Sequence, residues 1–235
     1  MRTLAIGDIH GCSTALRALA ALVGFRDDDT LVTLGDYVDK GPDVRGVLDW
    51  LCDRAERFPG RLIALRGNHD QMMLDARRDP AAFSDWWLCG GAATLDSYPP
   101  ARNGDPLAAV PDHHWDWLGS TRLYHEDAGH LYVHGNLDPA LPLDRQPIEQ
   151  LLWAKFVDPR PHVSGKVMFA GHTSQKDGEV VDLGHAVCID TWAVGQGWLT
   201  CCEPATGRLW HADRAGRTRR GRLQPRDSKL PIRQL

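Results

Sequence analysis

Five short segments of the sequence carry side chains that bind metal ions, and each lies at or directly after the end of an apolar run. The segments are Gly7-Asp8-Ile9-His10-Gly11, Gly35-Asp36-Tyr37-Val38-Asp39, Gly67-Asn68-His69-Asp70, His134-Gly135-Asn136 and Gly171-His172. Carboxylate, amide and imidazole groups without a thiolate suit manganese or iron better than a structural zinc ion. Each segment alone is a weak signal, because a Gly-Asp pair often marks only a turn and a single histidine is often structural. Together, and in this order, they predict a metal centre.

Asp36 is the member of this set that is best suited to contact two ions at once. One carboxylate can bridge two metal ions that lie about 3.5–4 Å apart. Paired ions of this kind are used in phosphoryl hydrolysis, where they activate water and stabilise the transferred group. The residue types therefore predict a two-metal hydrolytic site.

The apolar runs that precede these segments have the length and composition of buried β-strands. They comprise residues 4–6, 31–34, 62–65, 131–133 and 167–170, and a sixth run of the same kind lies at 186–189. Apolar residues at helical spacing follow the first two runs, at 16–23 after a cap at Ser13 and at 44–55 after Pro42. The first third is thus predicted to be β-α-β-α-β. Ligands of open α/β sheets bind outside the carboxyl ends of the strands, so the five segments are expected to converge.

Two later regions differ in character. From about residue 71 to residue 120 the apolar periodicity weakens and tryptophans gather, which predicts a helical insertion with loops; the tryptophans are Trp86, Trp87, Trp115 and Trp117. Beyond residue 180 the chain becomes β-rich. Residues 204–207 predict the turn of a hairpin between strands at 198–202 and 208–211.

Composition is ordinary for a globular domain. The chain has 235 residues, 43% hydrophobic and 25% charged, with a net charge of −4. From Arg208 to the C-terminus, eight arginines and one lysine face two aspartates, so this end is strongly basic and the remainder acidic. We expect a single domain over residues 1–213 and a basic tail over 214–235. A solvated C-terminus explains the tail without nucleic acid, which we do not expect as a partner.

Targeting signals are not evident in the sequence. The N-terminus runs straight into a short apolar stretch that ends at Asp8, so no signal peptide is expected, and no apolar run is long enough to span a bilayer. The six cysteines lack paired C-x-x-C spacing and are interpreted as reduced thiols. These features favour the cytoplasm.

The order Gly-Asp-x-His-Gly, Gly-Asp-x-x-Asp-x-Gly, Gly-Asn-His-Asp, His-Gly, Gly-His resembles the phosphoprotein phosphatase branch of the calcineurin-like metallophosphoesterases. The resemblance covers most of the chain. Bacterial and phage Ser/Thr phosphatases and symmetrical diadenosine tetraphosphate hydrolases are the members that look most similar. The resemblance implies an α/β fold with two central β-sheets sandwiched between helical layers.

The resemblance also implies roles for individual residues. The first ion would be held by Asp8, His10 and Asp36, and the second by Asp36, Asn68, His134 and His172. His69 would be the general acid that protonates the leaving oxygen, with Asp39 orienting its imidazole. Manganese is the favoured metal, with iron and zinc as alternatives.

Binding of the phosphate is the point at which the sequence departs from the family pattern. Lys40 stands where the family usually has an arginine. A flexible ammonium group therefore replaces a planar guanidinium that could donate two parallel hydrogen bonds to the phosphate. Asn68, Arg66 and, by a loose match, Lys155 are the other candidates. The segment from Trp86 to Gly91 resembles one that lines the substrate cleft in bacterial members, but a helix end packing its tryptophans into the core explains it equally well.

The mechanism implied is in-line attack of a metal-bound hydroxide on a phosphate ester, with phosphorylated proteins, peptides or small monoesters as substrates. Hydrolysis of diadenosine tetraphosphate is the main alternative, with a base pocket supplied by the tryptophan-rich insertion. A phosphodiesterase or nuclease, and a metal-binding scaffold without turnover, are weaker alternatives. The scaffold is disfavoured because His69 and Asp39 are present with every ligand.

Overall fold

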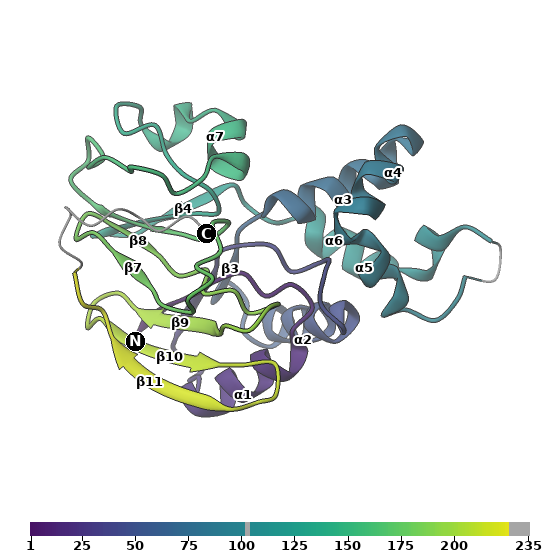
Figure 1. The fold of residues 1–235 in the computed structure, drawn as a ribbon, viewed down its shortest axis with the longest axis horizontal. Coiled ribbons are helices and arrows are strands. Elements are labelled where there is room, and N and C mark those ends of the chain that lie inside the picture. Colours follow the sequence, from purple (N-terminus) through teal and green to yellow (C-terminus); the bar gives the residue numbers. More distant parts are fainter. Residues whose placement is uncertain (102–103, 226–235) are drawn as a thin grey trace.

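The protein, seen in a computed structural model, is built on two β-sheets with helices outside both (Figure 1). Residues 1–101 and 104–225 are described. The first sheet has the strand order β11-β10-β9-β1-β2-β3 and the second has the order β4-β5-β6-β8-β7. In Figure 1, α1 lies below the sheets and α7 (Ile148–Trp153) above them. The predicted α/β arrangement of two sheets between helical layers is confirmed.

The predicted β-α-β-α-β unit forms one half of the first sheet. Its elements are β1 (Thr3–Ile6), α1 (Ser13–Val23), β2 (Thr30–Thr33), α2 (Val44–Arg57) and β3 (Leu62–Ala64). The three strands are parallel, with Ala5 beside Val32 and Val32 beside Ile63. α2 begins where the Asp43 side chain accepts a hydrogen bond from the N–H of Gly46, which satisfies a free donor of the first turn.

The other half of the first sheet is antiparallel. It contains β9 (Leu199–Glu203), β10 (Arg208–Ala212) and β11 (Thr218–Arg222), with β9 paired to β1. The predicted hairpin is therefore present. β11 pairs with β10 along its whole length, so the domain boundary expected after residue 213 falls inside the sheet and is wrong. The remainder of the expected tail, 226–235, lies outside the described residues.

The second sheet carries the two late histidine segments. It consists of β4 (Tyr124–Glu126), β5 (His130–Val133), β6 (Val167–Ala170), β7 (Val181–Asp182) and β8 (Ala186–Cys188). β5, β6 and β8 are parallel, and β4 and β7 pair antiparallel at the edges. Parallel strands place their carboxyl ends at one edge, which brings the segments after β5 and β6 together.

The apolar core has layers because side chains on a strand point alternately to opposite faces. In β1, Ala5 packs between the two sheets with Val32, Tyr132 and Phe169. Its neighbours Leu4 and Ile6 face the other way, toward the helices, in a cluster with residues of α1 and α2. The central strands are covered on both faces, which explains their continuous apolar runs.

A helical insertion projects from one side of the sheets, at the right of Figure 1. It comprises α3 (Asn68–Arg78), α4 (Pro80–Trp86), a π-helical turn (Trp87–Gly91), α5 (Ala92–Asp96), a 3-10 turn (Pro106–Ala109) and α6 (Asp112–Gly119). A second 3-10 turn, Leu143–Arg145, precedes α7. None of the helices in the described ranges is both long and apolar enough to span a membrane. All six cysteines are free thiols.

Candidate metal centre and catalytic cleft

A cleft of about 560 Å³ opens at the carboxyl ends of the parallel strands. Its walls include five of the predicted metal ligands, namely Asp8, His10, Asp36, Asn68 and His172. The sixth, His134, is fully buried, and its Nε2 lies 3.0 Å from Asn68 Oδ1. Asp8, His10, Asp36 and Asn68 follow strands of the first sheet, whereas His134 and His172 follow β5 and β6 of the second. The fold thus brings all six predicted ligands to one place, where the carboxyl ends of the parallel strands of both sheets meet.

The backbone at the ligands is unusual. His10, Asp36 and His172 have φ angles of 40°, 52° and 60°, in the left-handed region that residues other than glycine rarely adopt. Two glycines allow the chain to pass close to the carboxylates, since a Cβ at Gly67 would lie 2.0 Å from Asp36 Oδ1 and one at Gly171 would lie 2.2 Å from Asp8 Oδ1. Backbone strain of this kind concentrates at functional sites.

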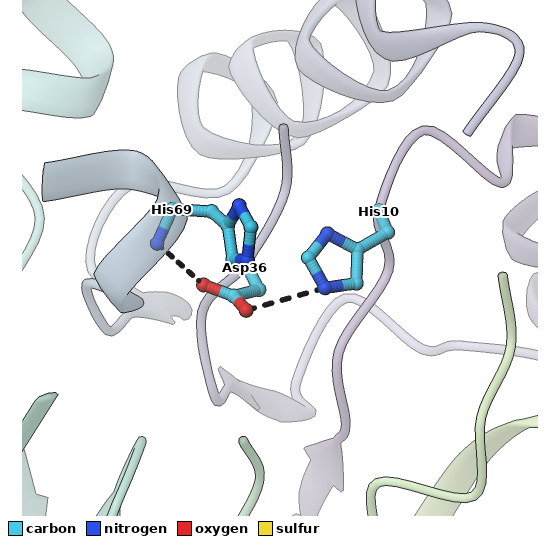
Figure 2. Close-up of side chains that lie close together, drawn as sticks. All are labelled: His10, Asp36 and His69. Carbon is cyan, nitrogen blue, oxygen red and sulfur yellow. Dashed lines mark hydrogen bonds and ion pairs between the residues drawn. The ribbon is translucent and has the colours of Figure 1, made fainter. Parts of the chain in front are cut away.

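Asp36 presents its two oxygens to two different histidines. Its Oδ2 lies 3.2 Å from His10 Nε2, and its Oδ1 lies 3.4 Å from His134 Nε2. Figure 2 shows the carboxylate between His10 and the backbone N–H of His69. Ligands about 2.1 Å from one ion and at right angles to each other lie about 3 Å apart. The separations fit two ions that share Asp36.

The second group of ligands has the same spacing. Asn68 Oδ1 lies 3.0 Å from both His134 Nε2 and His172 Nδ1. Three side-chain groups in the described residues could each hold an ion. Two of them lie here, His10 with Asp36 and His69, and Asp36 with His134 and His172, while the third is Asp49 with His113 and His114. An amide oxygen and two imidazoles around one carboxylate form a donor set for a borderline or hard divalent ion.

Backbone carbonyls fix the orientation of the three histidine rings. His10 Nδ1 donates to the carbonyl of Val38 at 2.7 Å, and His134 Nδ1 donates to that of Leu34 at 2.9 Å. His172 uses its other nitrogen, Nε2, which donates to the carbonyl of Trp153 at 3.1 Å. The remaining nitrogen of each ring therefore presents a lone pair to the site, as metal ligands require.

Burial keeps two of these imidazoles neutral. It lowers the pKa of His172 to about 3, because a second positive charge beside His134 and Lys155 would also be unfavourable. Burial also lowers the pKa of His134. A neutral imidazole is the form that binds a metal, so both side chains are ready to bind an ion at neutral pH.

Buried carboxyl groups lie close together in the same place. Burial, together with Asp190 and Asp36, holds the pKa of Asp8 well above its usual range. Burial also acts to raise the pKa of Asp36, but His134 and His10 outweigh it and lower that pKa well below its usual range. Crowded carboxylates are costly unless cations neutralise them, so the electrostatics fit divalent ions.

His69 and Asp39 form the predicted pair. Asp39 is fully buried, and its Oδ2 accepts a hydrogen bond of 2.7 Å from His69 Nδ1. The carboxylate also accepts hydrogen bonds from Trp86 Nε1 at 3.0 Å and Thr94 Oγ1 at 2.7 Å. The ring centroid of His69 lies 4.9 Å from that of His10. Asp39 thus fixes the ring beside the metal ligands, with Nε2 available for proton transfer.

Trp86 and Thr94 are functional residues that the sequence analysis missed in this role. Trp86 is fully buried and donates to Asp39, so it helps to fix the carboxylate that contacts His69. No residue from 86 to 91 is among those that line the cleft. Trp86 packs into the core as the alternative expected, whereas Trp87 is exposed. Gly90, with φ 122°, packs against the turn that follows Asp39, and its carbonyl accepts a hydrogen bond of 3.2 Å from the N–H of Lys40. A buried indole N–H usually has a hydrogen-bond partner, so a tryptophan expected in the core could have been predicted to bond a polar side chain.

Asp70 is another missed residue. Its carboxylate accepts hydrogen bonds from the N–H groups of Asp36 at 2.9 Å, Tyr37 at 3.0 Å and Gly67 at 2.8 Å. Burial and the nearby Asp36 charge raise the pKa of Asp70 to about 8, although the N–H donors oppose this. Asp70 therefore joins the loops that carry Asp36 and Asn68.

Replacing Asp70 with asparagine is expected to loosen both ligand loops. The amide has one acceptor oxygen, so at least one buried N–H loses its partner, and the free energy of unfolding should fall by about 1–3 kcal/mol. Metal affinity should fall by about 10–100-fold, as for other groups that position ligands. Urea denaturation and manganese titration measure the two effects. Asp75→Asn, on the same helix, should leave metal affinity unchanged; equal effects from both variants would contradict this role.

The predicted phosphate-binding residues divide into two groups. Lys40 and Lys155 line the cleft with Asn68, and Lys40 Nζ donates to His10 Nε2 at 3.2 Å. The guanidinium of Arg66 lies elsewhere. It donates to the Thr121 hydroxyl, the Gln71 side chain and the carbonyls of Gly119 and Thr121, so it fastens the end of β3 to the end of α6. The assignment of Arg66 to phosphate binding is corrected accordingly.

Arg66→Ala is expected to affect stability and leave substrate binding unchanged. The loss of its hydrogen bonds should lower the free energy of unfolding by about 1–3 kcal/mol. The KM for para-nitrophenyl phosphate should stay within about twofold of wild type, because the guanidinium does not face the cleft. Lys155→Ala is the comparison and should raise KM. A raised KM with unchanged stability for Arg66→Ala would return this arginine to the phosphate site.

One further wall of the cleft was absent from the sequence analysis. It consists of residues 173–177, which follow His172, and of Trp192. Trp192 also has a left-handed backbone, with φ 64°. Neither residues 173–177 nor Trp192 has a local sequence signal. Residues 173–177 follow β6 and Trp192 follows β8, so they form one wall only because these two strands pair.

Comparison with known proteins identifies the family to which the chain belongs. The calcineurin-like phosphoesterase family model matches residues 1–195. The chain is 32% identical over 204 residues to serine/threonine-protein phosphatase 1 of Salmonella typhimurium strain LT2, covering 83% of this chain and 88% of that protein. It is 30% identical over 146 residues to the symmetrical bis(5'-nucleosyl)-tetraphosphatase of Nitrosospira multiformis, covering 62% of this chain and 47% of that protein. The chain thus spans about half the length of the tetraphosphatase.

A solved structure agrees in fold. A crystal structure provisionally assigned to a diadenosine tetraphosphatase superposes with a TM-score of 0.65 at 20% identity, covering 94% of this chain and 93% of that one. The family implies divalent metal ions, for which the two groups around Asp36 are the candidate sites. The family model covers far more than half of the chain, and the phosphatase relative matches along most of both lengths. The chain therefore belongs to the calcineurin-like phosphoesterases and is a hydrolase of phosphoric esters.

Proposed function

We propose that this protein is a manganese-dependent phosphomonoesterase that acts on phosphoserine and phosphothreonine in proteins or peptides. The observation that carries the proposal is the placement of Asp36, whose two oxygens face His10 and His134 separately, beside the pair formed by His69 and Asp39. Two divalent ions at these ligands would activate a water molecule and neutralise the charge of the phosphoryl group.

The side chains of the cleft would bind and protonate the substrate. Lys40 and Lys155 supply positive charge to the phosphate oxygens, and Asn68 can donate to one of them. His69 donates a proton from Nε2 to the leaving oxygen, while Asp39 holds the proton on Nδ1 and stabilises the positive imidazolium form before transfer. The lysines hold phosphate as point charges, so the orientation of the group depends mainly on the metal ligands.

Phosphoproteins are favoured over dinucleoside polyphosphates for two reasons. The phosphatase relative matches over 88% of its length, against 47% for the tetraphosphatase. The tryptophans of the insertion, which would have supplied a base pocket, do not lie in the cleft: Trp86 is buried behind Asp39, and Trp87 lines a separate apolar groove. The free thiols are compatible with the proposed cytoplasmic location.

The test is initial-rate hydrolysis by metal-stripped protein with and without added manganese. We expect manganese-dependent release of phosphate from para-nitrophenyl phosphate and from a phosphothreonine peptide. Diadenosine tetraphosphate is the second arm, and faster turnover of it than of the peptide would replace the proposed substrate. Absence of hydrolysis with manganese, iron or zinc would contradict the phosphomonoesterase itself.

A further inference from the structure

A cluster of side chains that can bind a metal ion lies outside the catalytic cleft, where α6 packs against α2 (Figure 1). It consists of Asp49 of α2 and the adjacent histidines His113 and His114 of α6. One ligand atom from each of the three lies within 4.8 Å of the other two. None of the three is among the residues that line the cleft, so the proposed hydrolysis does not account for their arrangement.

His114 is held with one ring nitrogen toward the carboxylate. Its side chain is fully buried, its Nε2 lies 3.0 Å from Asp49 Oδ1, and its Nδ1 lies 2.8 Å from the hydroxyl oxygen of Tyr98. Burial lowers the pKa of His114, and the neighbouring His113 lowers it further. The imidazole is therefore mainly neutral at pH 7, with a single ring proton to share between two partners.

That proton can occupy either nitrogen, because the Tyr98 hydroxyl can donate or accept a hydrogen bond. Burial, together with Asp49, raises the pKa of Tyr98, so the hydroxyl keeps its own proton. When Nδ1 donates to Tyr98, the lone pair of Nε2 faces the Asp49 carboxylate, and a cation between the two groups removes their repulsion. A histidine that ligates a metal in this way usually donates its other N–H to a fixed acceptor, which Tyr98 provides.

His113 can supply a third ligand from the solvent side. Its side chain is exposed, and its ring centroid lies 4.3 Å from that of His114. Two ligands about 2.0–2.1 Å from a zinc ion lie about 3.3–3.4 Å apart at a tetrahedral angle, close to the 3.0 Å between His114 and Asp49. Arg45 Nε lies 3.6 Å from the other oxygen of Asp49, Oδ2, so Oδ1 remains the oxygen that faces the histidines.

We propose that Asp49, His113 and His114 bind one zinc ion, with water as the fourth ligand, at a site separate from the candidate centre at Asp36. Three protein ligands and one open position are a common arrangement for zinc. Imidazole-containing sites bind zinc more tightly than manganese, so manganese leaves this site to other ions. The ion links α6 of the helical insertion to α2, and the inference does not depend on the proposed function.

Zinc content after equilibrium dialysis tests the site directly. The metal-stripped wild type should bind one zinc ion more per chain than His113→Ala or Asp49→Asn, which alter exposed side chains. Two control variants should bind as many ions as the wild type. They are Asp53→Asn, one turn further along α2, and His125→Ala, which removes a half-buried imidazole of β4. With manganese in place of zinc, all five proteins should bind the same number of ions.

Hydrogen exchange shows where the additional ion binds. Zinc should slow the exchange of amide hydrogens in α6 of the wild type but not of Asp49→Asn. Manganese-dependent hydrolysis by His113→Ala should equal that of the wild type, which separates the lost zinc from the catalytic centre. Equal zinc content in the wild type, His113→Ala and Asp49→Asn would overturn the proposal, as would the same loss in Asp53→Asn or His125→Ala. A wild type without hydrolysis would instead overturn the proposed function, since the zinc content is measured separately.

Discussion

The His69→Ala protein is expected to keep its metal ions and to lose about 10²–10⁴-fold in kcat on alkyl phosphates, the usual contribution of a general acid. An alkoxide is a poor leaving group, so turnover depends on the proton that His69 provides. Para-nitrophenolate leaves without a proton, so the loss on para-nitrophenyl phosphate should be about tenfold or less. The contrast between the two substrates separates a missing acid from a general loss of structure.

The measurement is steady-state hydrolysis of a phosphothreonine peptide and of para-nitrophenyl phosphate, with metal content determined on the same samples. Asp39→Asn should act in the same direction, and the double variant should lose little more than His69→Ala, because the two side chains act as one unit. His113→Ala, which removes an exposed imidazole of α6, is the matched control. Full activity of His69→Ala on the peptide would remove this residue from the mechanism.

Asp36→Asn should have the largest effect on the metal centre. Asparagine is close in shape but has one carbonyl oxygen, so it cannot present a carboxylate oxygen to His10 and another to His134. Bound manganese should fall from two ions per chain to one or none, and turnover should fall below about 1% of wild type, because both ions contribute to the reaction.

Metal analysis after dialysis, together with para-nitrophenyl phosphate hydrolysis, checks this expectation. Asp53→Asn, at an exposed aspartate of α2 that pairs with Arg57, gives the same chemical change away from the cleft and should leave both quantities unchanged. Retention of two ions by Asp36→Asn would show that this carboxylate is not the bridge.

The strands that carry the candidate ligands could be predicted from the sequence, because each is marked by a short apolar run and the residues that follow it. Short apolar runs that end at ligand-type residues correspond to β1, β2, β3, β5 and β6, and the sixth predicted run corresponds to β8. Parallel strands place such ends along one edge of each sheet, and the packing of the two sheets then brings Asp8 of the first beside His172 of the second. The amide of His172 donates to Asp8 Oδ2 at 3.0 Å although the two residues are 164 positions apart.

The features that were missed or wrong depend on distant partners. β11 is short, exposed and arginine-rich, as an edge strand can be, so only its pairing with β10 makes it a strand. Arg66 directly precedes Gly67-Asn68, but its side chain turns toward α6, and adjacency in sequence does not fix that direction. Trp86 contacts Asp39 across 47 positions. Sequence spacing alone contains no information about these contacts.

The seam between the two sheets passes through the candidate metal centre, since four candidate ligands follow strands of one sheet and two follow strands of the other. Bound ions would therefore act as a cross-link between two separate layers. An ion that binds only the folded state stabilises it by about 4 kcal/mol at a thousand times its Kd. Amide hydrogens of β2 and β6 should then slow together in hydrogen exchange when manganese is added. Protection confined to one sheet would show that the layers open independently.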